Sequence, residues 1–390
     1  MIQKTIQILT NINCNLDCDY CYEKKHDRVN SIDDIKKYID FKFEEFNNEP
    51  IPLTIEFIGG ESLLYVELLE EIMQYIFLKN RTATTKHNIT FSLSTNGTLI
   101  ATEPKVKEFL TKYRNLLYIG VSLDGIKEIH DKHRIYKTNR QGCYDDVVTA
   151  LTWLKDNYPM CKVGLKGTFV HDTVDRLSES VINMLQFGAK NDIGSNPVYE
   201  ETWTIEDGAK ITTQLFKIID YVYDNNLEKE IKLFHIMTPE PEHYGNKFVK
   251  ENRNYCGSCV HMQCIGFDKK IYGCNRFCTA NIKGLEVGYM DENNINITNQ
   301  KLIDEVEVQY KKYPTDCQEC DLHSYCAACI AMPYELQKDP SMFLSEKRMC
   351  GWTYAQSLAR FYQKRKHLEK FKNVKQDHVC QKEQCQCKKE

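Results

Sequence analysis

The sequence predicts an α/β protein with a parallel sheet or barrel, followed by a small, irregular, cysteine-rich domain. Up to about residue 235, short apolar runs alternate with longer amphipathic runs, the pattern of parallel strand–helix units. Beyond that point the periodicity fades, and 13 of the 18 cysteines lie between Cys256 and the C-terminus. So irregular a segment needs something other than an apolar core to order it, and metal ligation is the obvious candidate.

The individual elements follow from the same patterns. Short apolar runs predict strands at 4–10, 53–58, 87–94, 116–123 and 162–170. Amphipathic runs predict helices at 31–47, 63–79, 103–113, 145–157, 174–187, 206–225 and 345–371. Ser31 and Asp34 have the spacing of a capping box at the first of these helices.

Composition restricts the classes of function that are open to the chain. A length of 390 residues suggests two or three domains, and a net charge of −4 argues against nucleic acid or an anionic membrane as the main partner. No run approaches 18 apolar residues, and the first residues lack an apolar run with a cleavage site. We therefore expect a cytoplasmic protein, where thiols stay reduced and clustered cysteines more often bind metal.

Three cysteines carry the strongest chemical signal. Cys14, Cys18 and Cys21 form C-x3-C-x2-C directly after the first predicted strand. Thiolates are the natural ligands of iron–sulfur clusters. Three of them hold only three irons of a four-iron cluster, which leaves the open position that a catalytic metal needs. A zinc site and three unrelated buried cysteines are the alternatives, but the position at a strand end favours the cluster.

Over about residues 4–200, this motif and three others resemble the radical S-adenosylmethionine (SAM) superfamily. The other motifs end successive predicted strands, where barrels bind ligands: Gly59-Gly60-Glu61, Ser94-Thr95-Asn96-Gly97 and Ser122-Leu123-Asp124-Gly125. The resemblance implies a partial (β/α)6 barrel of the radical SAM type over residues 1–235. It also implies reductive cleavage of SAM to a radical that abstracts hydrogen from the substrate.

By this resemblance, the motif residues would bind SAM. The Gly59-Gly60-Glu61 motif would bind the amino group, because glycine lets the backbone approach a ligand closely. Ser122 and Arg134 would contact the carboxylate, Arg134 through forked hydrogen bonds, and Tyr20 would lie near the adenine. The complete implied set is Tyr20, Gly59, Gly60, Glu61, Ser94, Asn96, Ser122, Asp124 and Arg134. Taken singly, the glycine motifs are ordinary turn signals and Arg134 is a surface charge.

The second cysteine set resembles the SPASM extension of radical enzymes that modify peptides and proteins. It would cover residues 236–355, followed by a C-terminal helix and a polar, cysteine-containing tail over 356–390. One auxiliary four-iron cluster would be held by Cys256, Cys259, Cys274 and Cys329, with Cys264 as the alternative to Cys256. The other would be held by Cys317, Cys320, Cys326 and Cys350.

Two features depart from the family pattern. Only two residues separate Cys326 from Cys329, and Lys269 replaces a usual glycine. A zinc ribbon is the alternative for this set, with the ligands Cys317, Cys320, Cys326 and Cys329. The other cysteines are expected in the core, on the surface or in the tail: Cys143, Cys161, Cys380, Cys385 and Cys387.

Together these features predict a radical SAM peptide or protein maturase. It would form a thioether or carbon–carbon cross-link in a ribosomally made, Cys-containing peptide, using three [4Fe-4S] clusters, SAM and a reductant such as flavodoxin or ferredoxin. The alternatives are formylglycine formation, as in anaerobic sulfatase maturases, and a non-catalytic iron–sulfur or zinc module. The sulfatase maturases would require an aspartate after the central cysteine of the extension. Here Asn275 follows Cys274, and an amide cannot accept a proton as a carboxylate does.

Overall fold

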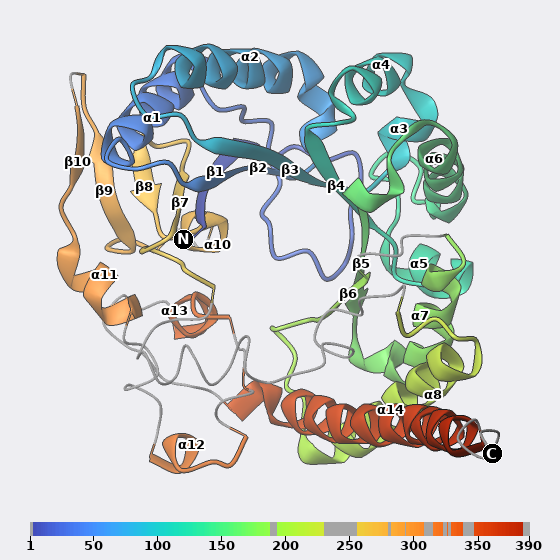
Figure 1. Cartoon of the computed structure of the whole chain (residues 1–390). Coiled ribbons are helices and arrows are strands. Elements are labelled where there is room, and N and C mark those ends of the chain that lie inside the picture. The colour runs from blue at the N-terminus through green and yellow to red at the C-terminus, as the bar shows by residue number, and fades with distance from the viewer. Residues whose placement is uncertain are drawn as a thin grey trace, which may run out of the picture.

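The computed structural model describes residues 3–187, 193–229, 256–279, 282–292, 294–307, 315–322, 326, 329–337 and 347–384, with the side chains of 195, 316, 318 and 372–384 excepted. Its centre is a ten-stranded sheet in the order β10-β9-β8-β7-β1-β2-β3-β4-β5-β6. Figure 1 shows this sheet curving through the molecule with helices outside it.

The first six strands are parallel and follow chain order, as a partial (β/α)6 barrel requires. They are β1 (Lys4–Asn11), β2 (Pro52–Gly59), β3 (Asn88–Thr95), β4 (Leu117–Ser122), β5 (Val163–Phe169) and β6 (Ile193–Pro197). The intervening helices are α1 (Ile32–Glu45), α2 (Val66–Thr82), α3 (Thr98–Thr102), α4 (Pro104–Tyr113), α5 (Lys127–His133), α6 (Tyr144–Asn157), α7 (Leu177–Leu185) and α8 (Ile205–Asp224). Single 3-10 turns are η1 (Ser62–Tyr65), η2 (Met160–Lys162) and η3 (His171–Arg176).

Alternation along each strand separates the two faces of the sheet. Ile55, Phe57 and Phe91 are fully buried, while their neighbours Glu56 and Ser92 are only half-buried. This alternation is typical of a sheet with one face packed on a core and the other face open. The apolar face packs against the outer helices, so the inner face of the curved sheet is left with polar side chains and glycines that can line a site.

Helix ends mostly follow their sequence signals. Ser31 caps α1 by accepting a hydrogen bond from the backbone N–H of Asp34, as expected. The full reciprocal capping box forms at α8, between Thr204 and Asp207. The helix predicted at 63–79 starts instead as η1, because the Glu61 carboxylate caps the 3-10 turn through the N–H of Leu63.

The C-terminal region continues the same sheet. β7 (Met262–Ile265) pairs in parallel with β1. The next three strands are antiparallel to their neighbours: β8 (Lys270–Tyr272), β9 (Glu286–Met290) and β10 (Ile295–Ile297). The sequence patterns missed these short strands and β6. Helical segments complete the region: α10 (Asn275–Thr279), α11 (Gln300–Glu307), α12 (Thr315–Gln318), α13 (Met332–Gln337), η7 (Lys347–Met349) and α14 (Cys350–Gln384).

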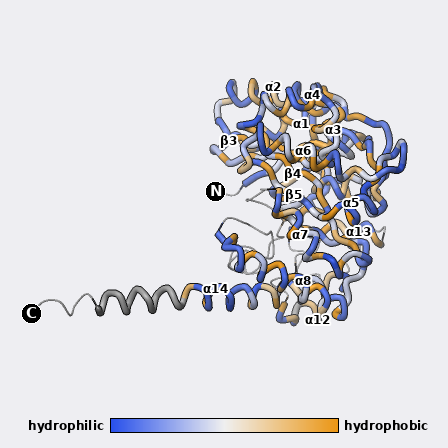
Figure 2. Tube along the Cα trace, turned by 90° about the vertical axis from the view of Figure 1, so that its right-hand side faces the viewer, coloured by the Kyte–Doolittle hydropathy of each residue, from blue (hydrophilic) through white to orange (hydrophobic). Residues whose placement is uncertain are grey.

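Helix α14 ties the C-terminal region to α8. The rings of Phe216 and Tyr362 stack at 4.1 Å, and Trp203 meets Trp352 edge to face at 5.3 Å. Figures 1 and 2 both show α14 beside α8, on the opposite side of the molecule from α2 and α4. Helix α14 continues as far as Gln384, beyond the helix predicted at 345–371, while Cys385 and Cys387 lie outside the described residues. In the described part of the chain, no helix has the length and apolar character needed to cross a membrane.

The junction of α8 and α14 depends on Gly351. A Cβ at this position would lie 1.8 Å from the carbonyl oxygen of Thr204, where backbone meets backbone. We therefore expect Gly351→Ala to lower the free energy of unfolding by about 1–3 kcal/mol, which thermal unfolding followed by circular dichroism would detect. Gly194→Ala is the matched control, because its Cβ would meet only the Leu165 oxygen at 3.8 Å. Equal losses in both variants would contradict the packing argument.

Candidate active site

Both cysteine sets reach one cavity inside the curved sheet. The cavity has a volume of ≈ 530 Å³ and is lined by Cys14, Cys18 and Cys21 together with Cys256, Cys274 and Cys329. Part of its wall comes from successive strand ends: Gly59, Gly60, Ser94, Thr95, Asn96, Ser122, Thr168 and Pro197. The predicted motifs of five different elements therefore meet in one place.

The thiols of the first motif fit an iron–sulfur cluster. Cys14 is buried, and its sulfur accepts hydrogen bonds from the backbone N–H of Leu16 at 3.4 Å and the side chain of Asn96 at 3.8 Å. Burial and the nearby Glu61 raise the pKa of Cys14 to about 12, and burial also raises the pKa of Cys18. Such thiols become thiolates only next to a strong positive charge, which bound iron would supply.

The two glycines of the second motif allow the backbone to approach the cysteine loop. A Cβ on Gly60 would lie 2.4 Å from the carbonyl oxygen of Asn13, just before Cys14. The backbone N–H of Gly60 donates to the Asn11 carbonyl at 3.1 Å. Gly59 and Gly60 line the cavity, so this motif presents backbone rather than side chain to a ligand.

Glu61 points away from the cavity, toward the end of β3. Its carboxylate accepts hydrogen bonds from the N–H groups of Leu63 at 3.1 Å and Asn96 at 2.7 Å, and from the Thr95 hydroxyl at 2.9 Å. Burial raises its pKa to about 7. The resemblance implies that the Gly59-Gly60-Glu61 motif binds the amino group of SAM. In the structure, the Glu61 carboxylate itself accepts hydrogen bonds that fix the turn carrying Asn96.

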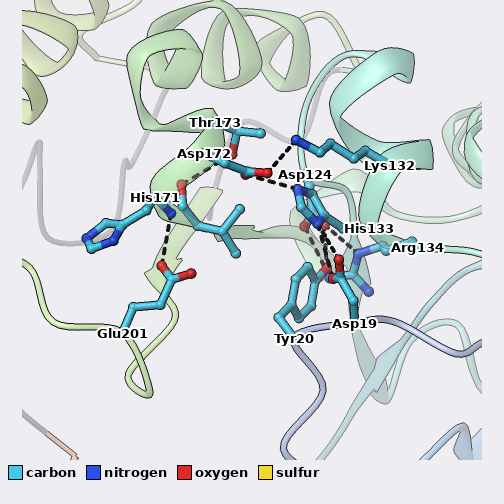
Figure 3. Close-up of polar contacts among 11 residues, drawn as sticks. Asp19, Tyr20, Asp124, Lys132, His133, Arg134, His171, Asp172, Thr173 and Glu201 are labelled. Carbon is cyan, nitrogen blue, oxygen red and sulfur yellow. Dashed lines mark hydrogen bonds and ion pairs between the residues drawn. The ribbon is translucent and has the colours of Figure 1, made fainter.

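Asp124 organises the opposite wall, as Figure 3 shows. It is fully buried and accepts hydrogen bonds from Arg134 Nε at 2.8 Å and Nη2 at 3.1 Å, from the Tyr20 hydroxyl and from the Thr168 N–H. Burial alone would raise the pKa of Asp124, but the charge of Arg134 outweighs burial and holds that pKa low. Asp124 thus engages the Nε and Nη2 side of the Arg134 guanidinium, and Arg134 also lines the cavity.

Asn96 and Ser94 make contacts that the sequence could not specify. The Asn96 amide donates to Asn15 at 2.8 Å, and its oxygen accepts from the Thr98 N–H at 3.0 Å. The turn needs Gly97, whose φ of 83° is left-handed. The Ser94 hydroxyl accepts a hydrogen bond of 2.7 Å from Lys166, a residue that sequence reasoning missed.

Sequence reasoning also missed a histidine that holds the cysteine loop. His133 is buried, and its Nδ1 lies 2.9 Å from the carboxylate of Asp19, which sits between Cys18 and Cys21. Figure 3 shows the two side chains facing each other beside Tyr20. His133 immediately precedes Arg134, so two consecutive residues hold Asp19 and, through Asp124, Tyr20. The signal available in the sequence was the pair of polar residues Asp19 and Tyr20 inside the cysteine motif, which need partners elsewhere in the chain.

Four cysteines of the C-terminal region are close enough to influence one another's pKa. Burial raises the pKa of Cys256, and nearby Cys274, Cys329 and Cys259 raise it further. Burial raises the pKa of Cys259 to about 12, with Cys274 adding to the effect. Gly273 leaves room for Cys259, since a Cβ there would lie 2.4 Å from its sulfur.

A second group forms around Cys326. Burial raises its pKa to about 11, a hydrogen bond from Thr353 lowers it, and the neighbours Cys350, Cys317 and Cys320 raise it. Cys264 lies near Cys274 as well, since Cys278 and Cys274 both raise its pKa, but it does not line the cavity. It is fully buried on β7 among Leu9 and Ile12, and its most influential charged neighbour is Cys278.

Asn275 faces the cavity at the start of α10. Its backbone N–H donates to the Gln7 side chain at 2.9 Å, and its side-chain amide donates to the Tyr22 hydroxyl at 2.9 Å. Glu23 lines the same cavity, and its Oε2 is buried without a hydrogen-bond partner among the described residues. Burial raises the pKa of Glu23 to about 7, against a hydrogen bond from Tyr22 that lowers it. The cavity therefore contains a carboxyl group although residue 275 is an amide.

Comparison with known proteins identifies the class. Residues 8–177 match the model of the radical SAM superfamily, so this part of the chain is a radical SAM domain. It is 26% identical over 342 residues to the cysteine-type anaerobic sulfatase-maturating enzyme of Clostridium novyi, which covers 80% of this chain and 84% of that protein. It is 25% identical over 246 residues to the radical SAM cyclopropyl synthase TigE of Paramaledivibacter caminithermalis. That alignment covers 57% of this chain and 48% of TigE, so the chain spans about half the length of TigE.

A solved structure shares the fold. The enzyme anSMEcpe with bound AdoMet and Cp18Cys peptide superposes with a TM-score of 0.69 at 18% identity, covering 93% of this chain and 98% of that one. The predicted partial barrel of the radical SAM type is therefore confirmed.

The buried contacts of Glu61 generate a prediction. Both of its oxygens accept hydrogen bonds from N–H or O–H donors. In Glu61→Gln an amide N–H would replace one acceptor and face another donor. We expect a loss of about 1–3 kcal/mol in the free energy of unfolding and weaker SAM binding in equilibrium dialysis, because Asn96 would shift.

The control is Glu67→Gln, since Glu67 is exposed and its ion pair is with the exposed Lys105. Wild-type stability and SAM affinity in Glu61→Gln would contradict a structural role for Glu61.

Proposed function

We propose that this enzyme is a radical SAM maturase that abstracts hydrogen from a Cys-containing, ribosomally made peptide or protein and forms a thioether or carbon–carbon cross-link. The observation that carries the proposal is the single cavity lined by both cysteine sets. Its volume of ≈ 530 Å³ lies within the range of small-molecule sites. A substrate residue inside it would be between the first motif and the C-terminal cysteines.

The residues present fit three four-iron clusters. Cys14, Cys18 and Cys21 would hold the SAM-cleaving cluster. When bound, the clusters supply the electron that cleaves SAM to methionine and a 5′-deoxyadenosyl radical, and an acceptor for the electron that a substrate radical releases. The reductant would be a one-electron donor of the flavodoxin or ferredoxin class.

The protein's own residues would position the reactants. Gly59 and Gly60 present backbone at the cavity wall, and Tyr20 is held at the opposite wall by Asp124. Ser122 lines the same cavity as Tyr20 and contributes a hydroxyl there. Burial of the site would exclude water and protect a radical from side reactions.

Two auxiliary clusters explain the C-terminal cysteines better than a zinc ribbon does. A ribbon would bring Cys326 and Cys329 to one ion, yet their neighbours differ: Cys326 lies near Cys317 and Cys320, whereas Cys329 influences the pKa of Cys274. Within the described residues, no three His, Cys, Asp or Glu side chains converge on one ion-sized point. A four-iron cluster spreads its thiolates further apart than a single zinc does. We assign Cys256 rather than Cys264 to the first auxiliary cluster, because Cys329 lies near Cys256.

Formylglycine formation is the second candidate. It is favoured by the alignment with the Clostridium novyi enzyme, which covers most of both chains, and by the carboxyl of Glu23 in the cavity. The amide at Asn275 disfavours it, because the resemblance would require a carboxylate there.

The cluster assignment predicts iron content. Anaerobically reconstituted protein should contain about 12 irons per chain, and Cys326→Ser and Cys329→Ser should each lose about four, from different clusters. Cys264→Ser is the control and should keep all of them. Zinc bound in place of iron, and lost in both Cys326→Ser and Cys329→Ser, would mean a ribbon. Metal analysis with Mössbauer spectroscopy makes the distinction.

The cross-link predicts a product mass. Anaerobic incubation with SAM, reductant and a short Cys-rich peptide encoded beside this gene should yield a product lighter by about two hydrogens per bond. One hydrogen leaves to 5′-deoxyadenosine, and the other leaves as a proton with one electron. Mass spectrometry after thiol alkylation should show one blocked cysteine per thioether. A formylglycine product would favour the second candidate, and an unchanged mass with solvent deuterium uptake would contradict cross-linking.

A further inference from the structure

Lys166 lies on the inner face of the sheet, below the strand ends that carry the radical SAM motifs. It belongs to β5 and is directly opposite Ser122 of β4 in the parallel register. Its side chain passes over Gly120, where a Cβ would lie 2.8 Å from Cε and 3.4 Å from Nζ. It ends on the Ser94 hydroxyl of β3, 2.7 Å away. Because Gly120 has no side chain, the Lys166 side chain can extend across β4 from β5 to Ser94 on β3.

The ammonium stands in a second cavity of ≈ 520 Å³ on the same face. Three glycines form much of the floor: Gly120, Gly164 and Gly194. The cavity meets the first one at Asn196, which lines both. Lys162 and Lys166 contribute its charge, and its lining contains no Asp or Glu. The cavity is therefore cationic, and it shares the wall residue Asn196 with the cavity in which SAM would be cleaved.

Lys166 differs from the cations of the first cavity in its partners. Arg134 is paired with Asp124, Arg276 with Glu200 and Glu335, and Lys25 with Asp17. Among the described residues, Lys166 contacts only a neutral hydroxyl, and Lys162 lies 4.0 Å from the Tyr118 ring. A cation that faces a ligand cavity with a neutral partner is suited to bind an anionic group.

We propose that Lys166, supported by Ser94 and the glycine floor, is a carboxylate-binding residue of this enzyme. The carboxylate has two possible sources, the methionine end of SAM and an acidic group of the substrate. The first rests only on membership of the radical SAM superfamily, and the second also rests on the proposed peptide substrate. Lys166 would add a second cation to Arg134, which the resemblance assigns to the SAM carboxylate and which donates to Asp124 through Nε and Nη2.

The SAM source is tested with SAM and its decarboxylated analogue on cluster-loaded protein. If Lys166 binds the SAM carboxylate, the wild type should bind SAM about 10- to 100-fold more tightly than the analogue, and Lys166→Met should reduce that ratio to a few-fold. Lys166→Arg should preserve most of the ratio. Lys162→Met is the matched control, because it removes the same charge from the same cavity and should keep the wild-type ratio. Iron content and thermal unfolding verify that each variant is intact.

The substrate source is tested with a displayed random peptide library that has one fixed cysteine, selected on the SAM-bound protein. The wild type should enrich Asp or Glu at a set distance from the cysteine, Lys166→Met should lose that preference, and Lys166→Glu should replace it with Lys or Arg. A library that gives no binders to any variant would count against the proposed peptide substrate and leave the SAM measurement valid. Wild-type SAM ratios in Lys166→Met, together with no acidic preference in the wild type, would overturn the proposal.

Discussion

The parallel pairing of β7 with β1 is the constraint on which the arrangement of the site depends. Cys14 follows the carboxyl end of β1, and β7 lies beside that strand with Thr5 opposite Met262 and Ile8 opposite Ile265. β8 then runs back antiparallel to β7, so Cys274 follows a strand end that faces the amino end of β1. The first cysteine set therefore reaches the cavity from the carboxyl ends of the parallel strands, and the C-terminal set reaches it from their amino ends. A substrate inside the cavity would lie between the two sets.

A second constraint is the pairing of charge around the cavity. Buried ions are costly unless they are paired, and Asp124 with Arg134, and Arg276 with Glu335, satisfy this requirement within the protein. These pairs serve geometry, because Asp124 holds Tyr20 and Arg276 lies 4.6 Å from the Tyr22 ring. Among the described residues, Lys166 has only a neutral partner and Glu23 keeps one oxygen without a hydrogen bond, so both have capacity left for a ligand.

Local signals in the sequence were sufficient for the barrel and for the residues that carry the motifs. Alternation predicted β1–β5, because a half-open sheet needs period-two burial, and the strand-end glycines marked the cavity wall. The sequence could not specify β6 and β7–β10, which are three to five residues long and stable only through their neighbours in the sheet. The sequence could not specify the hydrogen-bond partners of the site residues either. The contact between Arg134 and Asp124, ten residues apart in the chain, has no pattern in the sequence. The sequence did not single out Lys166 either, because its position over Gly120 and its hydrogen bond to Ser94 depend on how the strands pair.

The amide at position 275 changes the direction of a hydrogen-bond chain. Its N–H donates to the Tyr22 oxygen, so the single proton of that hydroxyl is left for the bond with Glu23. A carboxylate at 275 would have accepted the Tyr22 proton and reversed the chain. As it stands, Asn275 donates through its backbone N–H to Gln7 in the middle of β1 and through its side chain to Tyr22, and the hydrogen-bond chain continues from Tyr22 to Glu23 just after the cysteine motif. It therefore ends on a buried carboxyl whose second oxygen is unpartnered among the described residues. An unsatisfied buried acceptor costs about 1–3 kcal/mol, a cost that a donor group on a bound substrate would remove. With an amide at 275, the residue beside Cys274 supplies donors, and the carboxyl with an unpartnered oxygen in the cavity is that of Glu23, in the loop after the first motif.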